Sequence, residues 1–205
     1  MAVSTGFISR GFKGRRAAPA DASRLPPGQY LDRGFPVLSA GPTPRVSLDK
    51  WDLQVDGQVA HKQRWTWEQF LALPHETPRV DIHCVTKWSK LDTNWDGVSL
   101  DTILEPAEPI GAYLIAHCDG DYTTNLSLED VTDGKAWIVF GYEGDPLPPE
   151  HGGPARLLVP HLYFWKSAKW VRRLEVVDED EPGFWESAGY HMRGDPWKEE
   201  RYSGD

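Results

Sequence analysis

The sequence predicts an α+β fold that is dominated by a mixed or antiparallel β-sheet and contains few, short helices. Two observations lead to this prediction. Apolar runs such as 136–140 are short, rich in β-branched and aromatic residues, and bounded by turn residues, as is typical of strands. The helix signals are sparse, and each covers about two turns or fewer. A chain of 205 residues suits one domain that buries roughly 70% of its unfolded surface.

The first expected element is a β-hairpin. Residues Trp51 to Val55 alternate between apolar and polar, which favours a half-buried strand. Asp56-Gly57 is a strong two-residue turn signal, and Gln58 to Trp65 can return as the partner strand.

Two short helices are expected next. Thr66 followed by Gln69 fits a capping box that opens a helix from Trp67 to Leu73, which Pro74 ends. A second short helix is expected over 99–104.

The second half of the chain repeats these signals. Ser127 with Asp130 again fits an N-terminal cap for one helical turn, and Asp133-Gly134 then turns into a buried strand, Ala136 to Phe140. Two more strands are expected, at Pro154–Val159 and Lys169–Val177. From Asp178 onward the acidic tail has no clear period, but its many aromatic residues indicate that it packs back onto the body.

We expect two parts in the chain: an N-terminal arm over residues 1–30, and a single domain over residues 31–205. The arm is rich in Ala, Arg, Ser and Gly, and the Pro- and Gly-rich stretch 26–44 is typical of an extended surface loop. The Arg15-Arg16 pair is not followed by a hydrophobic stretch, so an export signal is not expected, and we expect a cytoplasmic protein.

The charge balance excludes some partners. With 22 Lys and Arg against 31 Asp and Glu, the formal net charge is -9, which repels nucleic acid and anionic membrane surfaces. No apolar run approaches the roughly 20 residues that span a bilayer. We therefore expect neither nucleic-acid binding nor a membrane span.

Cys84 is the most informative single residue. The chain has only one other cysteine, so a disulfide framework does not explain it, and a thiol at the end of a β-rich run can point into a cavity. A thiolate is a soft ligand suited to a transition metal. Two alternatives stay open: a small buried hydrophobe, and a nucleophile paired with a histidine. The candidate histidines are His83, His117, His151, His161 and His191, whose single, scattered positions argue against structural zinc.

A basic group stands out in this acidic chain. His151, Arg156, Lys166 and Lys169 supply positive charge, and Gly152-Gly153 can let backbone amides approach a ligand closely. A following Ser-Ala-Lys turn can add an amide, a hydroxyl and an ammonium, so the group suits a phosphate. The alternative is that these are ordinary solvent-facing charges.

The two motifs together resemble those of the sulfite oxidase superfamily of molybdenum oxidoreductases. The first runs Asp-Ile-His-Cys84-Val-Thr-Lys-Trp-Ser and is followed by Trp95-x-Gly-Val-x-Leu. The second runs Pro-Leu-Pro-x-x-His-Gly-x-Pro-x-Arg156-Leu-x-Val-Pro and is followed by Lys169-Trp-Val. The likeness covers roughly residues 50–177 and is closest to the branch of the protein-methionine-sulfoxide reductase catalytic subunit. It implies the molybdopterin-binding fold of that superfamily.

The resemblance also implies roles for individual residues. Cys84 matches the thiolate that ligates molybdenum, beside the dithiolene of the molybdopterin and oxo or hydroxo groups. His151 and Arg156 match a cofactor-binding pair, and Ser167, Ala168 and Lys169 match the turn that holds the cofactor. Asp119, or its neighbour Cys118, falls near another cofactor contact. Lys87, Trp88 and Asp119 are candidate pocket residues, although Trp88 also suits core packing.

Some family features are missing. The relatives' Asn-rich contact segment is replaced here by Gly34 to Pro44, so Leu38, Ser39 and Ala40 are expected to contact the cofactor through backbone groups. The sulfite-binding arginines near the cysteine motif are also absent, since Val-Thr-Lys follows Cys84. Sulfite is therefore not the expected substrate.

The function implied is oxygen-atom transfer by a molybdenum-molybdopterin enzyme on a sulfoxide, an N-oxide or a related small or peptidic substrate. The chain has no haem or flavin motif, so an external electron-transfer partner is expected. The alternatives are a sulfite-type dehydrogenase of the same superfamily, a cofactor-free binding module and a cysteine-based hydrolase.

Overall fold

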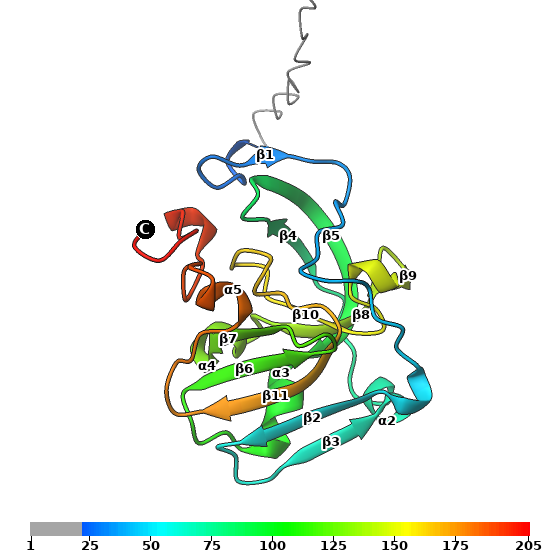
Figure 1. Ribbon diagram of the computed structural model, residues 1–205. Helices are drawn as coiled ribbons and strands as arrows, with labels where there is room; N and C mark the ends of the chain where they lie inside the picture. Colours follow the sequence, from blue (N-terminus) through cyan, green and yellow to red (C-terminus); the bar gives the residue numbers. More distant parts are fainter. Residues whose placement is uncertain (1–21) are drawn as a thin grey trace, which may run out of the picture.

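The computed structural model describes residues 22–205, and residues 1–21 lie outside the described part. Two β-sheets form the body of the protein, and short helices connect some of their strands (Figure 1). Each sheet contains both parallel and antiparallel pairs. The α+β prediction with mixed sheets is confirmed.

The first sheet has six strands. Its central path runs β1-β5-β8-β10, with β4 paired to β5 and β9 paired to β8. Within it β1 runs parallel to β5, and the other pairs are antiparallel. The strands are β1 (Tyr30–Leu31), β4 (Arg79–His83), β5 (Trp88–Ser99), β8 (Trp137–Tyr142), β9 (Asp145–Pro146) and β10 (Arg156–Leu158).

The second sheet has five strands in the order β3-β2-β11-β6-β7. Here β2 and β11 are parallel, although they come from opposite halves of the chain, and the other pairs are antiparallel. The strands are β2 (Asp52–Gly57), β3 (Gln63–Thr66), β6 (Tyr113–Cys118), β7 (Thr123–Ser127) and β11 (Val171–Val177).

The capping signals at Thr66 and Ser127 predicted two of the helices, and the helix expected over 99–104 also forms. In α2 (Trp67–Leu71) the Gln69 amide donates to Thr66 Oγ1 and the Thr66 amide donates to Gln69 Oε1, which is the predicted capping box. The helix ends two residues before the predicted Leu73. Two more short helices follow capping serines: α3 (Leu100–Leu104) follows Ser99, and α4 (Leu128–Val131) follows Ser127. Each serine hydroxyl accepts a hydrogen bond from the backbone amide three residues later.

The predicted hairpin forms, but its turn is not at Asp56-Gly57. Strand β2 continues through Gly57, and β3 begins only at Gln63. The reason is the neighbouring strand β11, where Glu175 and Val176 pair with Asp56 and Gly57. A Cβ on Gly57 would lie 2.2 Å from the Val176 carbonyl oxygen, so this glycine serves the close approach of two strands.

Strand β8 separates two apolar clusters, because successive side chains of a strand point to opposite faces. Ile138 faces the main core, which also holds Leu174 of the second sheet. Trp137 and Val139 face a smaller, aromatic cluster that contains Cys84. Cys84 therefore lies on the side of the first sheet that faces away from the main core.

The tail packs back onto the body, as predicted. A short helix, α5 (Phe184–Ser187), lies beside β7 (Figure 1). The later residue Arg201 is buried. Within residues 22–205, no helix is long and apolar enough to cross a membrane. Residues 1–21 of the predicted arm lie outside the described residues, so the boundary at residue 30 stays a prediction.

Candidate functional site

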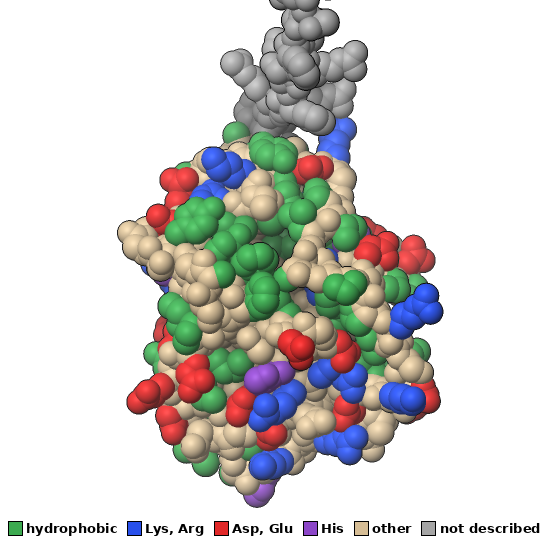
Figure 2. All heavy atoms as spheres, viewed as in Figure 1, with side chains coloured by type: hydrophobic (Ala, Val, Ile, Leu, Met, Phe, Trp, Pro, Cys, Tyr) green, Lys and Arg blue, Asp and Glu red, His purple; other side chains and the backbone are tan. Residues whose placement is uncertain are grey.

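Eight of the residues predicted for the site line one cavity of about 500 Å³. Figure 2 shows hydrophobic side chains gathered around a hollow on this face, with many of the charged side chains in view lying below it. The predicted residues on the cavity wall are Ser39, Cys84, Asp119, His151, Arg156, Ser167, Ala168 and Lys169.

Cys84 opens the tight turn of residues 84–88, which joins β4 to β5 and is called here the Cys84 turn. The Cys84 amide donates to the Trp88 carbonyl at 2.8 Å, and the Lys87 amide donates back to the Cys84 carbonyl at 3.0 Å. Lys87 takes a left-handed conformation with φ 77°. The turn closes the hairpin and leaves the Cys84 side chain on the cavity wall.

The Cys84 thiol is buried, with 7% of the residue exposed. Burial raises the pKa of the thiol, while the hydrogen bond from Thr86 Oγ1 to Sγ, at 3.2 Å, and the charge of Arg201 act against that rise. Desolvation therefore disfavours a free thiolate here, and a bound cation would reverse the preference.

The described histidines do not form a nucleophile pair with Cys84. His83 is next to it in the chain, but its Nδ1 is 2.8 Å from Ser89 Oγ. Burial lowers the pKa of His83 to about 4. Within residues 22–205, the hydrogen bond at Cys84 Sγ comes from Thr86, so the geometry gives no support to a cysteine hydrolase.

Arg156 is a fully buried cation at the start of β10. Its guanidinium donates to three backbone carbonyls, those of His151, Leu157 and Ser167, and lies 4.1 Å from the centre of the Phe164 ring. Within the described chain no carboxylate pairs with it. Burial lowers its pKa to about 9, which is the mark of a charge held without a counter-ion.

Lys169 is the second cation on the wall. Its Nζ donates to the carbonyls of Leu38 and Glu150, each at 2.7 Å. Burial and the nearby Arg156 charge lower its pKa to about 8. Burial and both cations also lower the pKa of His151. These mutually repelling groups favour an anion in the cavity.

The glycine pair acts differently from the prediction. The Gly152 and Gly153 amides are not free for a ligand, because they donate to the carbonyls of Pro149 and Pro148. A Cβ on Gly152 would lie 3.0 Å from Arg156 Cβ, and one on Gly153 would lie 2.1 Å from the Leu147 carbonyl oxygen. Gly152 lets this loop pack closely against Arg156, and Gly153 lets the loop fold back onto Leu147.

The Ser-Ala-Lys turn is also committed to internal contacts. Ser167 Oγ accepts from the Val159 amide at 2.8 Å, and the Ser167 carbonyl accepts from Arg156. The Ala168 amide donates to the Lys166 carbonyl. The turn therefore fixes the wall, and Lys169 is its charged group that faces the cavity.

The segment from Phe35 to Ser39, which precedes β2 in the chain, covers another side of the cavity. Phe35 stacks on His151 with ring centres 3.9 Å apart and planes within 9°, and Leu38 receives the Lys169 bond. Ser39 lies beside them and is exposed, so it stands at the rim. These contacts tie the stretch to the second motif.

Asp119 lies on the wall just after β6, with its carboxylate 3.4 Å from Arg172. Its neighbour Cys118 does not line the cavity, and burial raises the pKa of that thiol strongly. Two other predictions need correction. Lys87 is exposed and does not line the cavity. Lys166 does not either, because it is buried against Glu186.

Sequence reasoning missed an aromatic side of the cavity. Trp185 and Tyr190 of the tail stack with ring centres 5.0 Å apart, and Trp165 meets Tyr190 edge-on at 5.1 Å. All three line the cavity, together with Phe164 and Trp88, and Trp88 is also part of the aromatic cluster. The only available signal was the predicted return of the aromatic tail to the body.

Comparison with known proteins adds a family. The model of the oxidoreductase molybdopterin-binding domain matches residues 40–185. The uncharacterized oxidoreductase YuiH of Bacillus subtilis is 44% identical over 195 residues, which cover 94% of this chain and 98% of that protein.

Two more distant relatives also match most of this chain. The protein-methionine-sulfoxide reductase catalytic subunit MsrP of Pseudomonas syringae is 27% identical over 80% of this chain and 53% of its own length. The crystal structure of the sulfane dehydrogenase SoxCD from Paracoccus pantotrophus superposes with a TM-score of 0.61 at 22% identity. That match covers 86% of this chain and 57% of the other.

Proposed function

Because the chain belongs to the oxidoreductase molybdopterin-binding domain family, within the sulfite oxidase superfamily as predicted, we propose that it is a molybdenum enzyme that removes oxygen from organic sulfoxides or N-oxides. The observation that carries the proposal is one cavity lined by a buried thiol and by two cations without carboxylate partners among the described residues.

The residues present fit a molybdenum-molybdopterin group. Cys84 would supply the soft thiolate ligand, and a metal ion would offset the burial that now raises its pKa. Arg156 and Lys169 would hold the phosphate of the pterin, which would supply the counter-charge they lack. His151, Asp119, Ser167, Ala168 and Ser39 would line the rest of its site.

The bound molybdenum would supply two-electron oxygen-atom exchange. In the proposed reaction an organic sulfoxide takes up two electrons and two protons, and the corresponding sulfide and water are formed. The chain binds and orients the reactants: Thr86 donates a hydrogen bond to the Cys84 sulfur, and the aromatic side excludes water. Trp185 and Tyr190 offer apolar rings to the organic substituents of the substrate.

The aromatic side of the cavity favours an organic substrate over sulfite. Sulfite is a small dianion that needs cations near the metal. Arg156 and Lys169 are committed to carbonyls and to the proposed phosphate, and the tail contributes three uncharged rings, Phe184, Trp185 and Tyr190, to the cavity. An organic oxide with apolar groups matches such a surface better. An external protein donating electrons, and cytoplasmic residence, are further parts of the proposal.

A substrate screen tests the proposal. Protein produced with molybdate would be assayed with a reduced one-electron dye against alkyl and aryl sulfoxides, peptidic methionine sulfoxide and N-oxides, and in the oxidising direction against sulfite. We expect dye oxidation with the organic oxides. Turnover of sulfite alone would favour the dehydrogenase alternative, and protein that binds neither metal nor pterin would favour a binding module.

A further inference from the structure

We propose that Gln29 and Arg201, from opposite ends of the described chain, are positioning residues that hold the Cys84 turn. The inference rests on the proposed function, because it takes Cys84 as the metal ligand. Neither residue lies within the span 40–185 that matches the family model. The support for the thiol would therefore come from segments outside the span that matches the family model.

The N-terminal contact is made by Gln29. Its Nε2 donates to the Cys84 carbonyl oxygen at 3.0 Å. The next residue, Tyr30, begins β1, and its amide donates to the Lys87 carbonyl at 2.9 Å. Strand β1 then pairs in parallel with the first residues of β5. The backbone that carries Gln29 is thus fixed to the far end of the same turn.

The C-terminal contact is made by Arg201. Its Nη1 donates to the Val85 carbonyl oxygen at 2.7 Å, and its guanidinium lies 4.9 Å from the centre of the Tyr163 ring. Only 9% of the residue is exposed. Tyr163 in turn forms a β-bridge with His83, immediately before Cys84. Arg201 therefore contacts the Cys84 turn and also packs against Tyr163, which is bridged to the last residue of β4.

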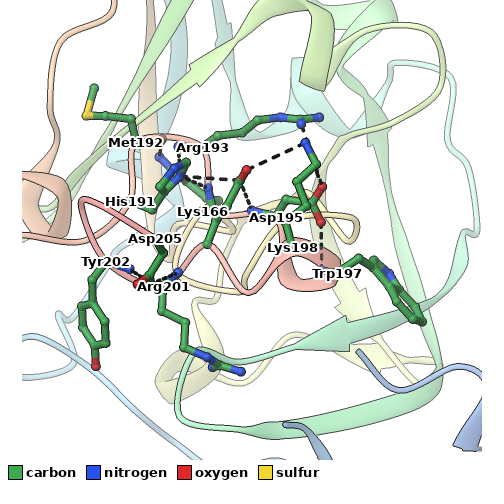
Figure 3. Close-up of polar contacts among 12 residues, drawn as sticks. Lys166, His191, Met192, Arg193, Asp195, Trp197, Lys198, Arg201, Tyr202 and Asp205 are labelled. Atoms are coloured by element: carbon green, nitrogen blue, oxygen red, sulfur yellow. Dashed lines mark hydrogen bonds and ion pairs between the residues drawn. The ribbon is translucent and has the colours of Figure 1, made fainter. Parts of the chain in front are cut away.

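The backbone of Arg201 is held by its own segment. Its amide donates to the Asp205 carboxylate at 3.0 Å, and the same carboxylate accepts from the Tyr202 amide at 2.7 Å. Figure 3 shows these bonds, with the guanidinium extended away from Asp205. In the same segment the Asp195 amide donates to the Glu200 carboxylate, and the Glu200 amide donates to the Asp195 carbonyl. The segment is folded so that the guanidinium is presented to the turn.

The two ends also meet each other. Arg201 Nη2 donates to the Pro27 carbonyl oxygen at 3.5 Å, and a Cβ on Gly28 would lie 3.1 Å from a Glu199 carboxylate oxygen. The two side-chain donors hold consecutive carbonyls, those of residues 84 and 85. Together they restrain the peptide planes on the C-terminal side of Cys84.

Such restraint matters because a metal ligand must keep its direction. Groups that orient a ligand without touching the metal commonly change metal affinity or activity by roughly 10-fold to 100-fold when removed. Arg201 also places a positive charge near the sulfur. If these residues only stabilised the fold, removing them would not selectively expose the Cys84 thiol and would not change the electronic properties of the site.

The first test measures reaction of Cys84 with iodoacetamide in full-length protein produced without the cofactor. Mass spectrometry follows alkylation at Cys84, with Cys118 in the same molecule as the reference. We expect Gln29→Leu and Arg201→Lys to speed alkylation of Cys84 by roughly tenfold, the effect of losing one hydrogen bond to the turn on local opening. The lysine variant keeps a positive charge near the sulfur, so the thiolate fraction that reacts is preserved. Lys198→Gln is the matched control, because Lys198 is exposed in the same segment and its ion pairs within the described chain are with Asp195 and Glu200.

The second test uses the metal-loaded protein and measures its midpoint potential. Loss of a nearby positive charge disfavours added electrons, so Arg201→Gln should lower the potential, whereas Arg201→Lys should lower it less. Lys198→Gln should leave it near the wild-type value.

The proposal is overturned if Gln29→Leu and Arg201→Lys both alkylate at the wild-type rate. If Arg201→Lys does not fold, Gln29→Leu decides the matter. The alkylation test needs no metal, so it fails separately from the proposed function, which fails if the wild-type protein takes up no molybdenum.

Discussion

The Lys166 ammonium lies 2.6 Å from the Glu186 carboxylate, and both side chains are completely buried. Glu186 belongs to α5 in the tail, and its Oε1 also accepts from the Trp165 indole at 2.8 Å. Lys166 further donates to the side chain and carbonyl of Asn125 in β7. This ion pair thus fixes the tail to the second sheet behind the aromatic side of the cavity.

Removing one partner should be costly. Glu186→Ala leaves a buried ammonium without its counter-charge, so the free energy of unfolding should fall by about 3–5 kcal/mol. Urea denaturation measures it. The double variant Lys166→Met with Glu186→Leu should recover much of the loss, because it leaves no unpaired charge. Equal losses in the single and double variants would contradict this account.

Arg156 should matter chiefly for cofactor retention. Arg156→Lys keeps the charge but loses the planar fork, and Arg156→Met loses both, so pterin content should fall in that order. The loss of charge-assisted bonds predicts a decrease in affinity of about tenfold to a hundredfold for the Met variant. Pterin fluorescence after release from the protein measures retention. Wild-type pterin content in Arg156→Met would exclude the phosphate role.

Lys169 predicts a pH dependence. Its pKa falls from the usual 10.5 to about 8 in the cofactor-free protein, so between these values the unfolded chain holds a proton that the folded chain lacks. Stability from this group therefore decreases as pH falls from about 10.5 towards 8. Phosphate binding needs the ammonium, so cofactor affinity should weaken as pH rises above about 8.

The matched variant for this prediction is Lys169→Met. It should bind the cofactor more weakly at pH 7 and lose the decline above pH 8. Cofactor loss after dilution at pH 7, 8 and 9 provides the measurement. A wild-type affinity that stays constant across this range would exclude the role given to Lys169.

The aromatic side should affect substrate binding more than chemistry. Trp185→Ala removes a ring that stacks on Tyr190, so KM for an aryl sulfoxide should rise several-fold while KM for dimethyl sulfoxide changes less. Trp197→Ala, an exposed tail residue outside the cavity, is the control. Equal changes for both substrates would argue against contact with the organic substituent.

Much of the fold followed from local signals. Thr66 and Ser127 marked helix starts because capping depends on a few neighbouring atoms. The position of the hairpin turn did not follow, because β11 pairs with β2 from 120 residues away, as in Arg173 opposite Gln54 and the Arg172 bond to Asp52. Such a contact leaves no local pattern.

The residues of the site likewise fall into those that local motifs reveal and those that depend on distant contacts. Cys84, Arg156 and Lys169 were found through two motifs, and the fold brings them to one cavity. Lys166 looked like a phosphate ligand because its partner Glu186 is 20 residues further along, in a tail without periodicity. Phe35, Trp185, Gln29 and Arg201 could not be found, because their roles depend on where both ends of the chain return.

The most direct test of the central claim is the molybdenum content of wild-type protein and of Cys84→Ser, purified from the same molybdate-supplemented host and measured by mass spectrometry of the metal. We predict close to one molybdenum per wild-type chain and activity with an organic oxide. Cys84→Ser should keep its fold and much of its pterin but lose activity. A wild-type protein without molybdenum, or an active Ser variant with a full complement of it, would contradict the assignment of Cys84 as the ligand.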